Sequence, residues 1–463
     1  MAKAGRNRLA ACCTVALLAL AGGNPAAGSP YDAQCCADLE RRIADLEEQA
    51  ARRGNKTVSV TVTGLVNNAI LTWDDGAESN AYVVTNDNQR SRFSFVGKAS
   101  ITPLLEAGYA LDIGLRAANS KLVTQLNDGD LISPGFNLRS SVWYLRHKLY
   151  GAIFVGSTFS ATDRIANSNV TQTSSFDQYS APENAGLGMY LRSSNNGLMT
   201  HSLLNWRRII GAGGDQPGES QRGFNQIKYV SPTWNGLTFA SDWVFTDFWD
   251  VALRYRKQIA GFDVAAGIGY LQLTPNSHTR SVCPSTFITN IADSTACKQL
   301  RGSISVKHMD TGVFANIGAN HTFDGIAAKT TRYENSGINS GQGFLAAQAG
   351  IERQLSPLGN TTLYGSYYMF DGGAASVLPV GPSDPLNPTG TGTWGVWHSS
   401  VEMWGGGLAQ GIDEADMILY LTYRHVSGDL TLRELQAGAA TGAIARTPID
   451  SLQLFLSGAV IKF

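Results

Sequence analysis

The chain ends in the stretch 451–463, SLQLFLSGAVIKF, in which one face of an extended strand carries Phe455, Ala459, Ile461 and Phe463. Successive side chains of a strand point to opposite faces, so this face is largely apolar. A closed barrel leaves no unpaired strand edge in lipid, because its last strand pairs with its first. The stretch therefore predicts the closing strand of a membrane barrel, with Phe463 as its assembly signal. A soluble β-sandwich that ends on Phe is the competing interpretation.

The composition indicates a membrane protein that crosses with strands. Charged residues make up 16% of the chain, below the roughly 25% of soluble domains, and 50 residues are Gly. The mean hydropathy is only −0.10. Beyond the N-terminus, no uninterrupted apolar run reaches the roughly 18 residues of a spanning helix. If the protein lies in a membrane, we expect it to span the bilayer as β-strands.

The N-terminus resembles a secretory signal. Lys3, Arg6 and Arg8 precede an apolar stretch at 9–21, and small residues offer cleavage sites between positions 21 and 28. We therefore assign residues 1–28 to a signal peptide. Loss of its three positive charges changes the formal net charge from −1 to −4. A charge so small favours no nucleic-acid partner.

Residues 29–56 form a short segment of a different character. Leu39, Ile43, Leu46 and Ala50 recur at the spacing of a coiled coil, over about two heptads, and Gly54 ends the pattern. We expect a short periplasmic helix here, either as a trimeric bundle or as a frayed amphipathic linker. The barrel is assigned to residues 57–463.

From Thr57 onward the apolar period changes from about 3.5 to 2, which is the period of a strand with lipid on one face and water on the other. The candidate strands are 57–73, 91–101, 106–117, 139–149, 152–158, 224–231, 236–245, 249–257, 263–273, 303–309, 312–321, 342–355, 361–370, 396–410, 415–425 and 451–463. These sixteen segments predict an all-β fold, a transmembrane antiparallel β-barrel of about 16 strands.

The lengths of the connections support this fold class. Connections after even-numbered strands are short turns, such as the PTWNG stretch at 232–236, whereas most connections after odd-numbered strands are long and polar. The long connections are 74–90, 118–138, 159–223, 274–302, 322–341, 371–395 and 426–450. Short periplasmic turns and long external loops are typical of outer-membrane barrels, and a sandwich has no reason to separate its loops by length.

Several segments resemble a known family. They are CCADLE at 35–40, IKYVSPTWNGLTF at 227–239, HMDTGVFANIGA at 308–319, QAGIERQLSPLGNTTLYGSYY at 348–368 and IDEADMILYLTYRH at 412–425. The chain is similar from about residue 35 to its end to the alpha-proteobacterial, rhizobial-type outer-membrane porins. The segment 189–210 fits the strand scheme poorly.

The resemblance implies a homotrimeric diffusion channel in the outer membrane of a Gram-negative bacterium. The expected partners are two further copies of the chain, outer-membrane lipid, the barrel-assembly machinery, and small hydrophilic solutes and ions. Peptidoglycan is a further candidate partner for the N-terminal helix. No cofactor is expected.

The third long connection, 159–223, is far longer than an external cap requires, and we expect it to fold into the lumen. The parity of the strands directs six basic residues to the lumen: Arg92, Arg116, Arg146, Lys228, Arg254 and Arg256. The third loop contributes three acidic residues: Asp163, Asp177 and Glu183. A basic wall opposite an acidic loop predicts a transverse field across the constriction, which orients polar solutes and slows apolar ones.

The cysteines predict a disulfide bond and no metal site. Cys283 and Cys297 share one polar stretch, and export to an oxidising compartment favours a bond between them. His278 is the only histidine nearby, and the three residues do not match a recognised metal-binding spacing. Cys35 and Cys36 are adjacent, so they either link chains or stay reduced.

Two other classes of function compete with a diffusion channel. His201, Ser202 and Asn205 suggest a barrel hydrolase, but they lack the spacing of a catalytic motif, so we predict no enzymatic activity. A structural tether through the N-terminal helix is the second alternative. Within the class of channels, a substrate-selective channel is the closest alternative.

Overall fold

The computed structural model describes residues 58–129, 135–193, 197–200, 204–210, 224–245, 247–275, 283, 295–325, 341–373 and 380–463. The signal peptide at 1–28 and the helix expected within 29–56 lie outside them. No helix in the described part of the chain is long and apolar enough to cross a membrane.

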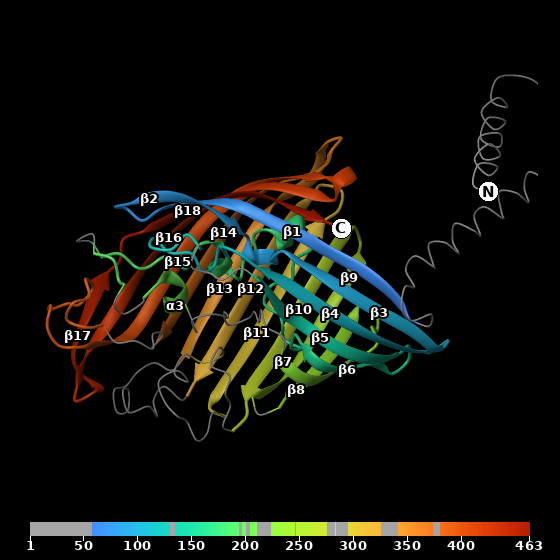
Figure 1. The fold of residues 1–463 in the computed structure, drawn as a ribbon, viewed down its shortest axis with the longest axis horizontal. Coiled ribbons are helices and arrows are strands. Elements are labelled where there is room, and N and C mark those ends of the chain that lie inside the picture. Colours follow the sequence, from blue (N-terminus) through green and yellow to red (C-terminus); the bar gives the residue numbers. More distant parts are fainter. Residues whose placement is uncertain are drawn as a thin grey trace, which may run out of the picture. The chain divides into compact units, whose positions relative to one another are not determined.

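The described residues form one sheet of eighteen strands. Two of these strands, β2 (Ser79–Thr85) and β17 (Ala439–Pro448), pair with neighbouring strands at the end of the barrel that carries the long connections. The remaining sixteen make the barrel wall: β1 (Ser59–Asp74), β3 (Arg92–Thr102), β4 (Leu105–Arg116), β5 (Gly135–His147), β6 (Gly151–Thr158), β7 (Phe224–Val230), β8 (Leu237–Val244), β9 (Phe248–Ile259), β10 (Phe262–Leu273), β11 (Cys297–His308), β12 (Val313–Asp324), β13 (Gly341–Ser356), β14 (Gly359–Gly373), β15 (Trp394–Ile412), β16 (Met417–Gln436) and β18 (Leu452–Lys462). Figure 1 shows these strands side by side around the barrel. The antiparallel barrel of sixteen strands predicted from the sequence is confirmed.

The barrel closes where its last strand pairs with its first. β18 is antiparallel to β1 over Leu65–Asp74, and it pairs with β16 on its other edge. Beyond this ladder, the Gly64 N–H donates to the Phe463 carbonyl at 2.8 Å, and the Phe463 N–H donates to the Gly64 carbonyl at 3.1 Å. A Cβ atom on Gly64 would lie 2.5 Å from Cζ of the Phe463 ring. The seam therefore requires glycine beneath the terminal ring.

Side chains alternate between an outer and an inner face, as the sequence predicts. On β12 the exposed and buried residues alternate without interruption, with Val313 and Ile317 outside and Phe314 and Asn316 inside. The large exposed apolar side chains of other strands, such as Leu253 on β9, follow the same rule. The outer face therefore presents the apolar surface that lipid requires.

Two of the predicted connections contain whole strands that were not predicted, and β5 and β11 begin earlier than predicted, at Gly135 and Cys297. Residues 74–90 and 426–450 were expected to be polar loops, but they contain β2 and β17. β2 pairs with the C-terminal half of β1, and β17 pairs with the end of β16 that extends past β18. The backbone N–H and C=O groups of these long strand ends form hydrogen bonds with β2 and β17. The alternation of apolar residues alone does not predict such pairing.

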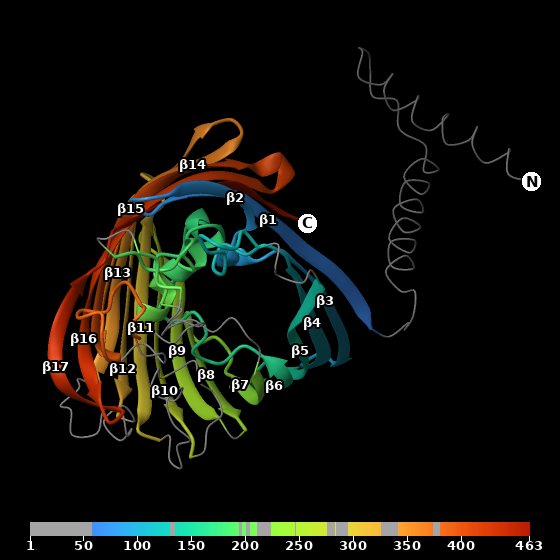
Figure 2. The same cartoon turned by 60° about the vertical axis from the view of Figure 1, so that its left-hand side comes forward.

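The third long connection, here called loop L3 (residues 159–223), folds into the barrel. Figure 2 shows its described part inside the ring of strands. It includes the 3-10 helices η2 (Gln172–Ser175) and η3 (Pro182–Ala185) and the short helix α3 (Trp206–Ile209). Phe176, Leu187 and Trp206 join a buried apolar cluster with wall residues such as Leu454. The segment 189–210, which matched no barrel strand, belongs to this loop.

The seam generates a first prediction. Deletion of Phe463, or Phe463→Ser, should reduce the folded barrel in the outer membrane several-fold, because closure of the last strand removes the unpaired edge. The measurement is heat-modifiable migration of the membrane-extracted protein on gels. Deletion of Gly390, an exposed loop residue, is the control. Equal yields for the two deletions would contradict the role assigned to Phe463.

The side-chain parity generates a second prediction on a single strand. Leu253 faces outward and is 43% exposed, whereas the inward Arg256 side chain is 57% exposed and pairs with Asp263. Leu253→Arg should destabilise the barrel by about 2–4 kcal/mol near the bilayer midplane. Arg256→Ala should leave folding nearly intact, because its site is wet. The measurement is the folded fraction of each variant in a urea titration. If Arg256→Ala is the less stable variant, the inward and outward faces of β9 are assigned the wrong way round.

Candidate functional site

The start of L3 is held against the wall by two basic side chains. Lys228 on β7 donates to the Phe159 carbonyl at 2.7 Å. Arg254 on β9 donates to the Ala161 carbonyl at 2.8 Å and to the Asp163 carbonyl at 2.6 Å. Both residues were predicted to face the lumen, and both point inward. Their charges lie where L3 leaves the wall.

Two carboxylates on neighbouring strands also bind the start of L3. Asp242 on β8 and Asp250 on β9 are a direct cross-strand pair, and both are buried. Asp242 accepts the Ala161 N–H and Asp250 accepts the Thr162 N–H, each at 2.8 Å. Two carboxylates at such positions repel each other, so the free-energy cost of burying them must be offset by these hydrogen-bond donors and by the neighbouring cations. Neither aspartate was predicted from the sequence as a site residue.

The middle of L3 follows the inner wall from β11 to β14. Ser303 donates to the Ile165 carbonyl at 2.6 Å. Further along, Glu352 on β13 accepts the Gln172 N–H at 2.7 Å and pairs with Lys307 at 2.6 Å. Because polar side chains of these strands form hydrogen bonds with the L3 backbone, L3 follows one defined path through the barrel.

The acidic residues of the L3 prediction require a correction. Asp177 is 3% exposed; it forms an ion pair with Arg424 on β16 and accepts the Tyr364 hydroxyl at 2.6 Å. Glu183 is 0% exposed and pairs with Lys121 at 3.5 Å. These two carboxylates therefore do not face solvent across the lumen. They fasten L3 to the wall and to the preceding long loop, since a buried carboxylate requires a charged partner.

The opposite part of the wall carries a second group of charges. On β3 and β5, Arg92 and Arg139 flank one carboxylate, that of Asp112 on β4, with Nε to carboxylate-oxygen distances of 3.9 and 3.1 Å. Arg139 also lies over the Phe159 ring, 5.5 Å from its centroid. Arg92 was predicted to face the lumen, but Arg139 was not. It is a bulged residue, because β5 skips one register position between Leu138 and Ser140.

Arg164 carries a further positive charge on L3. Its backbone is left-handed, with φ of 53°, which is costly for a residue with a side chain. It is an electrostatic neighbour of Arg92 and of Asp163. Burial raises the pKa of the Asp163 carboxyl above its usual value, although the surrounding cations oppose this shift. Asp163 thus lies among several basic side chains.

The remaining predicted residues lie toward the short-turn end of the barrel. Arg146 lies 3.7 Å from the Glu106 carboxylate, and its guanidinium lies 5.2 Å from the Tyr144 ring centroid. Arg256 pairs with Asp263 at 2.7 Å. The side chain of Arg116 lies outside the described residues. The predicted basic residues thus do not form one ring but occupy two levels of the wall.

A cavity of about 530 Å³ lies at the long-loop ends of β12, β13 and β14, and it is lined by Asn320, His321, Phe323, Gly341, Gln342, Gly343, Phe344, Leu345, Met369 and Asp371.

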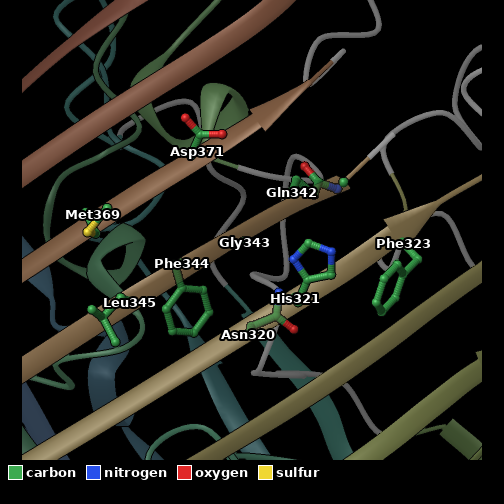
Figure 3. Close-up of a pocket in the computed structure, with 10 residues that line it drawn as sticks. Asn320, His321, Phe323, Gln342, Gly343, Phe344, Leu345, Met369 and Asp371 are labelled. Carbon is green, nitrogen blue, oxygen red and sulfur yellow. The ribbon is translucent and has the colours of Figure 1, made fainter. Parts of the chain in front are cut away.

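 Figure 3 shows the cavity among the ends of the three strands. His321, Leu345 and Met369 are on the outward side of their strands, where Leu345 and Met369 are exposed. The cavity therefore opens on the outer surface of the barrel and is not part of the lumen.

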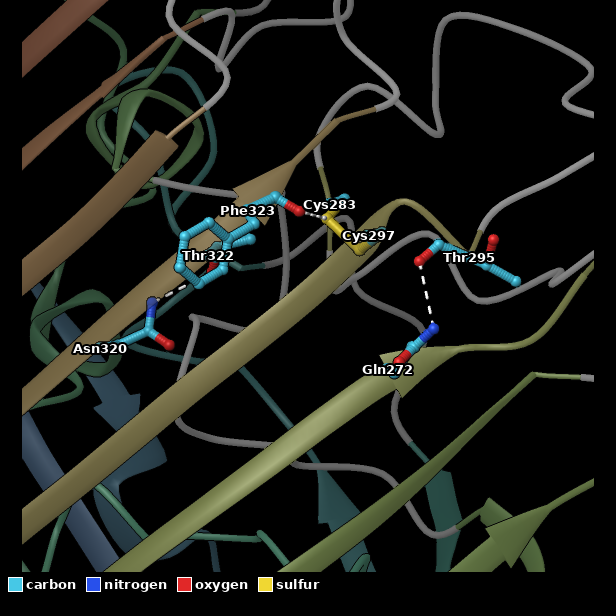
Figure 4. The surroundings of a disulfide bond; sticks show 7 residues. All are labelled: Gln272, Cys283, Thr295, Cys297, Asn320, Thr322 and Phe323. Carbon is cyan, nitrogen blue, oxygen red and sulfur yellow. Dashed lines mark hydrogen bonds between the residues drawn. A yellow bond between two sulfur atoms is a disulfide. The ribbon is translucent and has the colours of Figure 1, made fainter.

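A disulfide bond joins Cys283 to Cys297, as the sequence analysis expected. Both sulfur-bearing residues are fully buried, in an apolar cluster with Phe248, Leu271 and Leu273. Figure 4 shows the bond at the start of β11, next to the Phe323 carbonyl. The bridge ties the connection after β10 to the rim of the barrel.

Within the described ranges, no group of three or more His, Cys, Asp or Glu side chains could hold a metal ion. His201 and Ser202, the hydrolase candidates, lie outside these ranges. Asn205 caps the short helix α3 by accepting the Arg208 N–H at 2.9 Å, which is a structural role.

Comparison with known proteins gives consistent results. The family model described as Gram-negative porin matches residues 9–440. Among solved structures, the anion-selective porin from Comamonas acidovorans is 14% identical, with a TM-score of 0.51, over 88% of this chain and 100% of that chain. OprB of Pseudomonas putida, in a high pH structure, is 8% identical, with a TM-score of 0.50, over 91% of this chain and 96% of that chain. At such identities the structures share the fold alone. No curated protein sequence matches.

The anchoring of L3 generates a third prediction. Arg424→Gln leaves the Asp177 carboxylate buried without its cation, a loss that typically costs about 3–5 kcal/mol. L3 should then leave the wall more often, and single-channel recordings should show a changed conductance with more current noise. Arg446→Gln, which removes an exposed pair with Asp429, is the matched control. Identical traces for both variants would contradict the anchoring role of Asp177.

Proposed function

The chain belongs to the Gram-negative porin family and forms a β-barrel channel in the outer membrane, and from this premise we propose the route and the solutes of the channel. Small hydrophilic solutes and ions diffuse passively through a water-filled lumen, because a barrel of sixteen strands is too wide for side chains to fill. The path runs between L3 and the wall of β3 to β7. The observation that carries this route is the packing of L3 against the other strands.

The charges along this route favour anions. By strand parity, the described inward-facing charged side chains of β3 to β7 comprise five basic residues and two acidic ones: Arg92, Lys98, Arg139, Arg146, Lys228, Glu106 and Asp112. A net positive lumen attracts anions and repels cations. We accordingly keep Arg92, Arg146, Lys228, Arg254 and Arg256 as proposed pore-lining residues. Asp163 remains a proposed constriction residue on L3.

The assembly and the finer family assignment are further parts of the proposal. We propose a homotrimer of the rhizobial type, supported by the sequence segments that resemble that group, including CCADLE at 35–40. The barrel-assembly machinery inserts the chain through the closing strand that ends at Phe463. Residues 29–56 brace the trimer or contact peptidoglycan. The family match supports a channel and not an enzyme.

This proposal generates a fourth prediction. The purified protein should migrate as a heat-modifiable oligomer, and in planar bilayers its conductance should close in three equal steps, one for each barrel. The reversal potential in a salt gradient should indicate a preference for chloride over potassium. Closure in a single step from a monomeric species would rule out the trimer. A preference for potassium would rule out the proposed charge balance, while leaving the channel itself intact.

A further inference from the structure

The cavity on the outer surface of β12, β13 and β14 is a groove with a floor of glycine. Gly343 on β13 pairs with His321 on β12 at one edge and with Asp371 on β14 at the other. Gly341 pairs with Phe323, two residues nearer the long-loop end. Because the middle strand has no side chain at these two positions, its neighbours enclose a volume of about 530 Å³, as Figure 3 shows. A volume of this size is typical of a small-molecule site.

The groove lies at the edge of the apolar band around the barrel. On β13, Arg353 is an exposed, outward-facing charge at the short-turn end, and Gly343 lies ten residues away on the same face. At a rise of about 3.3 Å per residue and a tilt of about 40°, ten residues span about 25 Å along the bilayer normal. This distance is the height of the apolar band of such barrels. The groove therefore lies at the boundary between the acyl chains and the head groups of the outer leaflet.

The polarity of the groove changes along the bilayer normal. Leu345 and Met369, which are 45% and 39% exposed, line its end nearer the midplane, whereas Asp371 lines it at head-group level. Toward the midplane, the next outward residues of β13 are Ala347 and Ala349, whose small side chains leave room for an acyl chain along the strand. A polar end at the head groups and an apolar end within the acyl chains match a lipid better than a water-soluble solute.

The β11–β12 side of the groove offers two hydrogen-bond donors suited to a phosphate. His321 is exposed, and its ring packs edge-on against Phe323, with 4.4 Å between the ring centroids. Lys298 on β11 is the cross-strand partner of Phe323, so it lies on the same outward face. Within the described ranges, neither the His321 imidazole nor the Lys298 ammonium has a hydrogen-bond partner. An ammonium binds phosphate as a point charge, and an imidazole N–H supplies a second donor.

The opposite side of the groove carries the negative charge. The Asp371 carboxylate lies 3.4 Å from Nε2 of His398 on β15. A phosphate is repelled by this carboxylate and attracted by the Lys298 ammonium, so it binds on the β11–β12 side. The distribution of charge across the groove is thus complementary to a phosphate held in one position.

From these observations we propose that the groove binds one phosphate-bearing lipid of the outer leaflet. The phosphate contacts His321 and Lys298, and the start of one acyl chain lies over Leu345 and Met369. The site is outside the lumen, so the inference goes beyond the proposed route of solutes and requires only that the barrel lies in the outer membrane. A lipid held by both its phosphate and its chain stays on the barrel when bulk lipid is replaced by detergent.

The test uses the full protein in detergent, with native mass spectrometry to count bound lipid. The probes are dioleoylphosphatidic acid and dioleoylglycerol, which has the same chains but no phosphate. The wild-type protein should bind one phosphatidic acid per chain, at least about ten-fold more tightly than dioleoylglycerol. His321→Ala and Lys298→Ala should each weaken phosphatidic acid binding about ten-fold, the effect of losing one charge-assisted hydrogen bond, without changing the binding of dioleoylglycerol. Leu345→Gln should weaken the binding of both lipids.

The matched control is His308→Ala, which removes an outward imidazole at the short-turn end of β11, where it packs against Phe262. It should leave both affinities unchanged. Heat-modifiable migration shows that each variant is folded, and the conductance of His321→Ala in planar bilayers should equal that of the wild type. Loss of lipid binding is therefore distinguishable from failure of the channel.

Four outcomes would overturn the lipid site. They are equal affinity for the two lipids, equal weakening by His308→Ala and His321→Ala, and displacement of phosphatidic acid by inorganic phosphate at equal concentration, which would make free phosphate the ligand. The fourth is a photo-reactive side chain at Met369 that cross-links to a second copy of the chain in the membrane instead of to lipid.

Discussion

Lipid offers no hydrogen-bond partner to a strand edge, and the rest of this structure depends on that constraint. The edge of β18 must pair with the edge of β1, and the ladder continues past the end of β18 through reciprocal hydrogen bonds between Gly64 and Phe463. Once the sheet has closed, its inner face bounds a space that side chains alone cannot fill. L3 is long enough to fold into that space and to occupy part of it.

L3 turns part of the lumen into a packed interior. Its apolar residues pack against the wall that includes β18, whose inward residues Leu452, Leu454 and Leu456 are buried. The inner face of this strand is therefore apolar although it faces the barrel axis. Polar residues of the other strands bind the L3 backbone, as Ser303 and Glu352 do. Breaking one of these buried partnerships costs more than losing an exposed pair, which explains why L3 stays in place.

The charges of the barrel divide into two kinds with different consequences. Asp177 and Arg424 are buried together, so their pairing contributes to structure and leaves little field in the lumen. Arg92 and Asp112, whose side chains are 23% and 16% exposed, retain contact with solvent, so their charges act on passing solutes. The same residue types thus serve anchoring or selectivity according to their burial, because water screens only the exposed charges.

The sequence by itself determined the positions of the barrel strands, their parity and the separation of short turns from long loops. These features follow from local periodicity, and Arg254 and Leu253 accordingly lie on the predicted faces. Tertiary structure decided which wall L3 covers, and so whether a loop carboxylate such as Asp177 is buried or wet. It also decided the aim of Arg139, because a bulge shifts parity by one residue and depends on contacts with a neighbouring strand. Periodicity contains no information on partners that are distant in sequence.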